Sequence, residues 1–287
     1  MNEDISKKIE QYIKTMPSLP VSVTKVLELC NNVNVSPADL NYAISLDPVL
    51  VGRVLKLLNS AYYGLNQKVT SLVRAIVMLG INTVKNLALS TAILGTLPQN
   101  KNQKGLDMEG FWRHSLCVGV TAKLLAKKQG IDFQQIEEYF TAGLLHDIGK
   151  IPLNAVLSAK YLLAVTGADR SQASLIDAED ETLGINHCTS GVMISRAWKL
   201  EGPVADAIIY HHNLAGYSGG YKKILDNIVI ANFFASTNEI GFSGDRNPEK
   251  PAAEIWSASG IREDIFEDIT KDVHKEIEKA EVFLKIV

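Results

Sequence analysis

Apolar residues recur at helical spacing along most of the chain. One stripe follows Pro48 and contains Leu50, Val51, Val54, Leu55 and Leu58. A second stripe near the end of the chain contains Ile265, Phe266, Ile269, Val273 and Ile277. Strand-like alternation and hairpin turn signals are absent from the sequence. The pattern therefore predicts an all-α protein.

Several of the predicted helices have recognisable starts. The pairs Ser36-Pro37 and Asp47-Pro48 each place a capping side chain before a proline that suits the first helical turn. After a glycine that should end one helix, Asn82 is expected to cap the next, over the sequence TVKNLALSTAIL. These signals mark helix boundaries in the N-terminal third of the chain.

Two polar stretches divide the helical pattern. They cover residues 97–110 and 241–254, and both contain Pro and Gly. We expect an N-terminal helical subdomain over residues 1–100, a helical core over 101–240, and a polar linker with a final helix over 241–287. The final helix carries acidic residues early and lysines later, as the helix dipole favours. Its apolar stripe is expected to pack on the rest of the chain.

Composition indicates a globular protein of modest charge. Of the 287 residues, 46% are hydrophobic and 21% are charged, and the net charge is −3. Without a Lys/Arg run, this charge argues against binding nucleic acid through phosphate neutralisation. No apolar run approaches the ~18 residues of a membrane-spanning helix, and the polar start is not a signal peptide. Cys30, Cys117 and Cys188 form no C-x-x-C pair, so we interpret them as free thiols and predict a cytoplasmic protein without membrane contact.

Five of the six histidines fall within or at the ends of helical patterns in the predicted core. They are His114, His146, His187, His211 and His212, and Asp147 directly follows His146. Neutral imidazole is a common ligand of transition ions, and an adjacent carboxylate can bridge two ions. Ion pairs roughly 3.5–4 Å apart are the usual apparatus for hydrolysing phosphate esters. The set therefore raises the hypothesis of a metal site.

Each of these residues also has a structural explanation. A single histidine is more often a hydrogen-bonded core or surface side chain than a ligand. His211 and His212 would suit a helix C-terminus, and Asp147 would suit a cap for the helix after Gly149. Cys188 is set aside as a ligand, because neighbouring side chains on a helix face apart. Spacing alone leaves both interpretations open.

Three segments carry a resemblance to a known family. They are MPSLPVSVTKVLEL, SPADLNYAISLDPVLVGRVLKLLNSAYYG and VTSLVRAIVMLGINTVKNLAL, in that order. From about Met16 to about Ser236 the chain resembles the HDOD family, the HD-related output domain of bacterial signalling proteins. The resemblance implies a multi-helix bundle of HD type and a regulatory role in signal transduction.

The catalytic relatives of that family are the HD-GYP phosphodiesterases, which hydrolyse cyclic di-GMP at a site of two or three metal ions. Their pattern implies a ligand set made of His114, His146, Asp147, His187, His211 and His212, with Asn232 at the position of the closing Asp. It also implies that Lys150 would meet substrate phosphate if the site were active. The resemblance implies one or two divalent transition ions, among Fe, Mn, Zn and Ni.

Three departures from the catalytic pattern argue against efficient hydrolysis. Asn232 supplies a neutral amide in place of an anionic ligand. Gly110 stands where trinuclear relatives carry a glutamate, and the run after His212 lacks D-G-x-G-Y-P. We therefore expect a regulatory HDOD module that retains metal at its HD site without efficient catalysis. The alternative is a metal-dependent phosphohydrolase acting on a nucleotide or cyclic dinucleotide.

A regulatory role requires a signalling partner, which the sequence does not name. Nucleic acid is not expected as that partner, because the chain has no basic patch or aromatic platform. The final helix is a candidate contact surface for a homo-oligomer.

Overall fold

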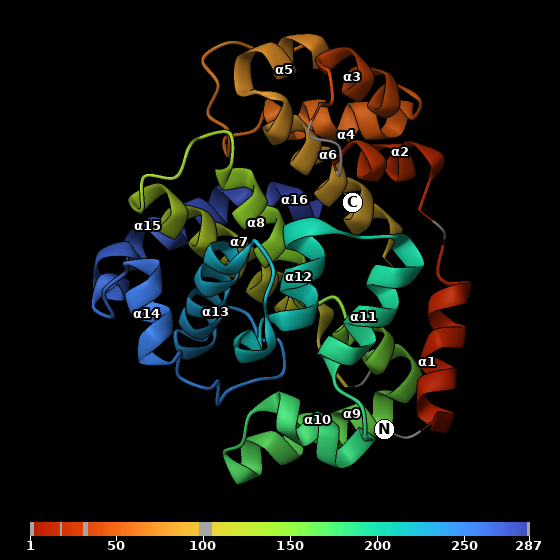
Figure 1. Cartoon of the computed structure of the whole chain (residues 1–287), viewed down its shortest axis with the longest axis vertical. Helices are drawn as coiled ribbons and strands as arrows, with labels where there is room; N and C mark the ends of the chain where they lie inside the picture. The colour runs from red at the N-terminus through yellow and green to blue at the C-terminus, as the bar shows by residue number, and fades with distance from the viewer. Residues whose placement is uncertain (1–2, 18, 31–33, 98–104, 286–287) are drawn as a thin grey trace.

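The computed structural model describes residues 3–17, 19–30, 34–97 and 105–285 (Figure 1). None of these residues forms a β-strand, and nearly all the elements are α-helices. The all-α prediction is therefore confirmed for this part of the chain. The predicted boundary at residue 100 lies outside the described residues, and the three-part division stays a prediction.

Five helices form a layer at one end of the molecule, drawn in red to gold at the top of Figure 1. They are α2 (Val21–Cys30), α3 (Pro37–Ser45), α4 (Pro48–Leu58), α5 (Leu72–Leu79) and α6 (Ile81–Thr96). Helix α6 contacts the other four and also packs against α8 of the core. This long, almost fully buried helix therefore joins the N-terminal layer to the rest of the fold.

The first helix lies apart from that layer. Helix α1 (Glu3–Thr15) packs against α9 and α11, at the opposite end of the core (Figure 1). Its inward face carries Ile5, Ile9 and Ile13, which recur at helical spacing and are buried. The chain therefore contacts two ends of the core before α7 begins.

The core contains seven α-helices and one short 3-10 helix among the described residues. They are α7 (Met108–Lys128), α8 (Ile136–Leu145), α9 (Lys150–Ser171), α10 (Leu175–Leu183), α11 (His187–Trp198), α12 (Gly202–Tyr210), η1 (Leu214–Gly216) and α13 (Lys222–Thr237). Helix α8 lies at the centre and contacts α6, α7, α12 and α13. Its C-terminal end is therefore enclosed on several sides.

Two glycines allow α7 and α8 to cross closely. A Cβ atom on Gly143 would lie 2.9 Å from the Cα of Gly119, and one on Gly119 would lie 2.8 Å from the carbonyl oxygen of Phe140. Real Cβ atoms do not approach backbone so closely, so larger side chains would separate the helices. The crossing matters for the site, because it brings α7 and α8 close together where the ring centroids of His114 and His146 lie 5.9 Å apart.

The C-terminal helices close the fold. They are α14 (Ala253–Ser259), α15 (Ile265–Ala280) and α16 (Val282–Lys285). Helix α15 packs along α7 with Ile269, Val273 and Ile277 buried, so the predicted apolar stripe is the inward face.

The predicted helix starts agree with the structure in two of three cases. Ser36 and Asp47 cap α3 and α4 through their side chains, and a proline follows each cap. The prediction for Asn82 is wrong, because α6 already begins at Ile81. Gly80 has φ 85°, a backbone conformation that glycine adopts without strain, and it turns the chain directly from α5 into α6. Asn82 therefore lies inside α6 and does not occupy its N-cap position.

Candidate metal centre

Four predicted histidine ligands surround the carboxylate of Asp147. His146 Nε2 lies 3.3 Å from Oδ2, His211 Nε2 3.5 Å from Oδ1, His187 Nε2 3.6 Å from Oδ1, and His114 Nε2 4.0 Å from Oδ2. These residues come from α7, the end of α8, the start of α11 and the end of α12. All are buried. The fold thus gathers residues that are far apart in sequence around one acidic group.

The turn between α8 and α9 carries Asp147 into this centre. Helix α8 ends at Leu145, and α9 begins at Lys150 without a side-chain cap, so Asp147 does not cap α9. A Cβ atom on Gly149 would lie 1.9 Å from the carbonyl oxygen of His187. Gly149 is therefore required for the close approach between this turn and the first turn of α11.

Hydrogen bonds from Nδ1 to backbone carbonyls fix the orientation of two imidazole rings. His146 donates from Nδ1 to the carbonyl oxygen of Gly143 at 2.7 Å, and His211 donates from Nδ1 to that of Ala207 at 2.7 Å. A carbonyl oxygen can only accept, so Nδ1 carries the proton in both rings. In the neutral ring, Nε2 then carries a lone pair that faces Asp147. This orientation is typical of metal-ligating histidines.

Two of the inward-facing atoms lack a hydrogen-bond partner among the described residues. His146 Nε2 and Asp147 Oδ1 are buried without a hydrogen bond from any described residue. The Nε2 atoms of His187 and His211 lie only 3.3 Å apart. Two nitrogens bound to one tetrahedral ion at ~2.1 Å lie roughly 3.4 Å apart. The cluster of buried acceptors therefore fits a cation.

Burial and nearby charges set the protonation of the cluster. Burial lowers the pKa of His114 to about 3 and that of His211 to about 4, so both imidazoles are neutral at pH 7. Burial alone would raise the pKa of Asp147, but His146 and Lys150 hold it well below its usual range. Neutral imidazoles around an ionised carboxylate are the forms that coordinate metal.

His187 has a different environment from the other histidines. Burial lowers its pKa, but the Glu179 carboxylate opposes this and, with a contribution from Cys188, raises the pKa to about 10. Glu179 Oε2 accepts from the His187 backbone N–H at 2.8 Å and from Nδ1 at 2.6 Å. Its Oε1 accepts from the hydroxyl of Tyr161 at 2.8 Å. The buried carboxylate of Glu179 thus fixes the His187 ring through Nδ1, as backbone carbonyls fix the rings of His146 and His211.

Glu179 is not among the site residues predicted from the sequence. It lies in the acidic run IDAEDE, eight residues before His187, and nothing local distinguishes it from Asp180 or Glu181. Only the packing of α10 against α9 and the turn into α11 show that its side chain points inward. The role of Glu179 can therefore be recognised only from the tertiary structure.

Cys188 lies closer to the cluster than its neighbouring position on the helix suggests. The ligand atoms of His187, Cys188 and His211 lie within 4.8 Å of one another, as do those of His114, His146 and Asp147. The Cβ atoms of neighbouring helical residues point in different directions. The side-chain torsions of His187 and Cys188 nevertheless bring the imidazole and the thiol together. Cys117 and Cys188 are free thiols, and the side chain of Cys30 lies outside the described part.

Lys150 is buried and already paired. Its ammonium donates to Asp147 Oδ2 at 2.7 Å and to the hydroxyl of Ser243 at 3.3 Å. Ser243 belongs to the loop after α13, whose Phe242 N–H donates to the carbonyl oxygen of Gly110 at 2.9 Å. Lys150 therefore balances the charge of Asp147 behind this loop.

Asn232 contacts a predicted ligand directly. His114 Nε2 lies 2.9 Å from Asn232 Oδ1, so in this arrangement the ring donates from Nε2 to the amide. The same nitrogen cannot bind a cation at the same time. Asp226, six residues earlier on α13, pairs instead with Lys222 at 2.7 Å. No acidic side chain of α13 thus takes the place of Asn232.

His212 lies against the cluster rather than inside it. Its ring centroid is 4.3 Å from that of His211 and 5.0 Å from that of His187. Burial lowers its pKa well below the usual value. His212, His211 and Asn232 line a hollow of about 300 Å³ beside α13 and the segment around Pro251. His212 could therefore reach an ion from that side.

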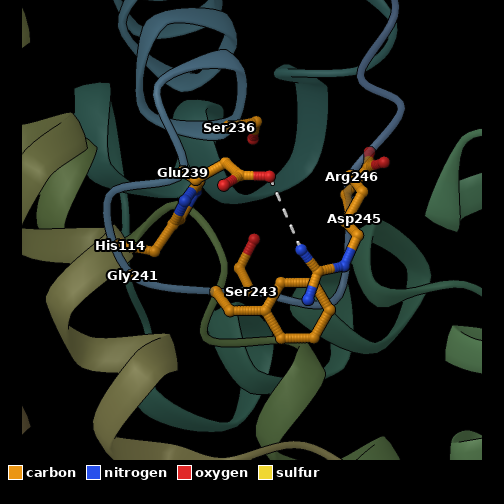
Figure 2. A pocket seen from close by; sticks show the side chains of 8 residues that line it. His114, Ser236, Glu239, Gly241, Ser243, Asp245 and Arg246 are labelled. Carbon is orange, nitrogen blue, oxygen red and sulfur yellow. Dashed lines mark ion pairs between the residues drawn. The ribbon is translucent and has the colours of Figure 1, made fainter. Parts of the chain in front are cut away.

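A second hollow, of about 210 Å³, lies on the other side of His114 (Figure 2). Figure 2 shows Arg246 reaching toward Glu239 across it, and the two charged groups are 3.7 Å apart. Arg246 also pairs with Asp169 at 3.4 Å. Of the cluster, only His114 lines this hollow. This hollow therefore borders one buried ring of the cluster and not the carboxylate of Asp147.

One described stretch, residues 136–171, is long and apolar enough by composition to cross a membrane. It consists of α8, the turn that follows and α9, and it includes the buried Asp147 and Lys150. Core helices of soluble proteins meet the same criterion, and both helices contribute to the interior here.

Comparisons with known proteins agree with this architecture. An uncharacterized protein of Treponema pallidum (strain Nichols) is 26% identical over 230 residues, which cover 79% of this chain and 44% of that protein. The chain thus spans less than half the length of this relative.

Two solved structures are similar over nearly their full length. An HDOD domain protein of Geobacter sulfurreducens has a TM-score of 0.76 and 22% identity, with 98% of each chain covered. A putative phosphohydrolase of Shewanella amazonensis SB2B has a TM-score of 0.71 and 25% identity, with 96% of this chain and 98% of that chain covered. Both comparisons support the same helical fold.

The family is decided by the sequence match. Residues 16–214 match the HDOD domain, a range that contains every predicted site residue except Asn232. Since this range is more than half of the sequence, the chain belongs to the HDOD family.

Proposed function

We propose that this chain is a regulatory module of bacterial signal transduction whose HD-type cluster binds one or two divalent transition ions without efficient catalysis. In this proposal the ion holds α7, α8, α11 and α12 together, so metal binding stabilises one arrangement of the core. The ligands are His146, Asp147, His187 and His211, with His114, His212 and Cys188 at the edge of the cluster.

The observation that carries the proposal is the set of buried acceptors without donors. His146 Nε2 and Asp147 Oδ1 have no hydrogen bond to any described residue, and the Nε2 atoms of His187 and His211 are 3.3 Å from each other. An unpaired buried acceptor costs about 1–3 kcal/mol. A bound cation removes this cost, and the hydrogen bonds at Nδ1 already hold the rings in the required orientation.

Three contacts support a weak or absent hydrolytic activity. Lys150 is engaged by Asp147 and Ser243 rather than facing a substrate site. Asn232 accepts a hydrogen bond from the ring nitrogen that His114 would use as a ligand. A divalent ion bound here would polarise water and phosphate oxygens, as in metal-dependent hydrolases. The exposed cations among the described residues that line the hollows beside the cluster, Arg246 and Lys250, are both engaged in ion pairs with carboxylates.

Elemental analysis of protein purified without chelator and without nickel resin tests the proposal. We expect near-stoichiometric metal in the parent and loss of metal in an Asp147→Ala variant. Asp226→Ala is the matched control, because Asp226 is equally buried but pairs with Lys222 away from the cluster. Metal-free parent protein that is folded, or equal loss of metal in both variants, would contradict the proposal.

The second candidate is a metal-dependent phosphohydrolase. It is favoured by the similarity to the Shewanella amazonensis protein that is named a putative phosphohydrolase, and by the full set of histidines. Asn232→Asp tests it, because a carboxylate at this position supplies an anionic ligand beside His114. If hydrolysis of bis(p-nitrophenyl) phosphate appears in metal-loaded Asn232→Asp but not in the parent, the parent is a disabled enzyme. Equal hydrolysis by the parent would favour this second function.

The signalling partner, a homo-oligomeric contact through the last helix and a cytoplasmic location stay predictions. The apolar face of α15 is used within the chain against α7. An oligomer formed through α15 would therefore use its charged outer face, and light scattering at low and high salt would test it.

A further inference from the structure

A cavity of about 520 Å³ lies away from the histidine cluster. It is formed by the connection between α4 and α5, by α7, by the turn between α7 and α8, and by α15. It is larger than the two hollows beside the cluster, which measure about 210 and 300 Å³. Small-molecule sites in proteins usually have volumes of about 300–1,000 Å³. The cavity is therefore large enough for a small organic ligand.

The walls of this cavity are apolar and aromatic. Helix α7 contributes Val120 and Leu124, the connection after α4 contributes Tyr63 and Leu65, and the turn before α8 contributes Phe133. Phe133 is 53% exposed, which is unusual for a large apolar side chain. A ligand with an apolar body would cover it and gain the burial of that surface.

The floor of the cavity is polar but internally neutralised. Glu137 is buried and forms an ion pair with Lys123. Tyr63 donates its hydroxyl to Glu137 at 3.4 Å, and Lys123 donates to the hydroxyl of Tyr62 at 3.1 Å. Burial raises the pKa of both tyrosines well above the usual value, so both phenols stay protonated. The floor therefore requires no counter-charge from a ligand.

The rim of the cavity carries one uncompensated positive charge. Lys279 pairs with Glu276 at 2.5 Å within α15. Lys127, one helical turn after Lys123 on α7, lines the cavity and has no ion pair or hydrogen bond through its ammonium to the described residues. An apolar wall beside a single free cation is complementary to an amphipathic anion.

We propose that this cavity binds a small amphipathic monoanion, with a hydrocarbon or aromatic body against Leu124 and Phe133 and a carboxylate or sulfonate at Lys127. The site is independent of the proposed metal function. Lys123 and His114 are nine residues apart on α7, a rise of about 14 Å. Ligand binding and metal content are therefore expected to vary separately.

Titration with the aromatic sulfonate 8-anilinonaphthalene-1-sulfonate tests the charge at the rim. We expect saturable binding to the full chain with one site. Lys127→Glu should weaken this binding by about fivefold, the scale of an exposed charge pair. Lys128→Glu is the matched control, because it makes the same charge change one residue along α7, beside a different hollow. Equal loss in both variants, or loss only in Lys128→Glu, would overturn the proposal.

Two further measurements keep the proposal falsifiable if the dye binds elsewhere as well. Decanoate should displace the dye from the saturable site, whereas decanol at the same concentration should displace at least fivefold less, because only decanoate is an anion. Leu124→Trp, which fills the cavity, should abolish the saturable component while circular dichroism and metal content remain those of the parent. Displacement by both compounds equally, or unchanged dye binding in a folded Leu124→Trp variant, would rule out an anion site in this cavity.

Discussion

The N-terminal layer α2–α6 and the core α7–α13 bury different kinds of side chain. Among the described residues of the layer, buried side chains are apolar or neutral polar, apart from Lys85. The core also buries charged and titratable groups: His114, Glu137, His146, Asp147, Lys150, Glu179, His187, His211 and Asp226. Exposed large apolar side chains show the opposite trend. Those in or next to the layer are Val21, Tyr42, Leu46, Val49, Val73, Val77 and Met78, against Phe133, Leu162, Leu163 and Tyr221 in the core.

The layer is thus mainly a region of apolar packing, whereas the core also holds the side chains of the candidate metal site. Burying a polar or ionised group is costly unless a partner or a metal compensates it, so a core that buries these nine residues must hold each in a specific arrangement. The layer has no such requirement and is stabilised by apolar burial. Substitutions in the two regions should therefore act on different observables, namely metal content in the core and the free energy of unfolding in the layer.

The largest expected effect is that of a methyl group on Gly149. Gly149→Ala places Cβ 1.9 Å from the carbonyl oxygen of His187, which is backbone and cannot move alone. We expect a loss of at least about 4 kcal/mol in the free energy of unfolding, or failure to fold, together with loss of metal. Urea denaturation and elemental analysis measure both.

Gly167→Ala is the matched control for that substitution. Gly167 lies in the same helix, α9, and a Cβ there meets nothing within 4 Å. The alanine should stabilise the protein by up to about 1 kcal/mol, because glycine is a poor helix former. Similar effects of the two substitutions would show that the contact between the turn and α11 is not tight.

The second prediction separates the layer from the core. Leu58→Ala removes a fully buried side chain from α4 and should cost about 3 kcal/mol in the free energy of unfolding. Metal content of the folded variant should not change, because Leu58 has no contact with the cluster. Val49→Ala on the same helix is the control, since Val49 is 62% exposed and its loss should cost less than about 0.5 kcal/mol. A fall in metal content in Leu58→Ala would contradict this separation.

The effect most specific to the core is that of Glu179→Gln. The amide keeps the size of the side chain but removes the charge that orients His187 through Nδ1. Loss of such a partner typically weakens metal affinity by about 10–100-fold. Competition with a chromophoric chelator measures this affinity. Glu181→Gln, exposed on the same helix, should have no effect. Unchanged affinity in Glu179→Gln would mean that His187 is not a ligand.

The sequence by itself determined the local features of this protein. Helical spacing predicted the stripes that are buried in α4 and α15, and the pairs at Ser36 and Asp47 predicted two helix starts. These signals succeed because capping and amphipathicity depend on residues within one or two turns. The order of the motifs also identified the HDOD family, and with it the residues that now surround Asp147.

The tertiary structure decided how those residues interact. His114 and Asn232 are 118 positions apart in the chain, yet they share a hydrogen bond that occupies a candidate ligand atom. Glu179 looks like any acidic surface residue, and Lys150 looks free to meet a substrate, until α10 and the loop after α13 are in place. Even the start of α6 at Ile81 depends on the sharp turn at Gly80. Contacts of this kind depend on which helices meet in space, and spacing along the chain does not record that.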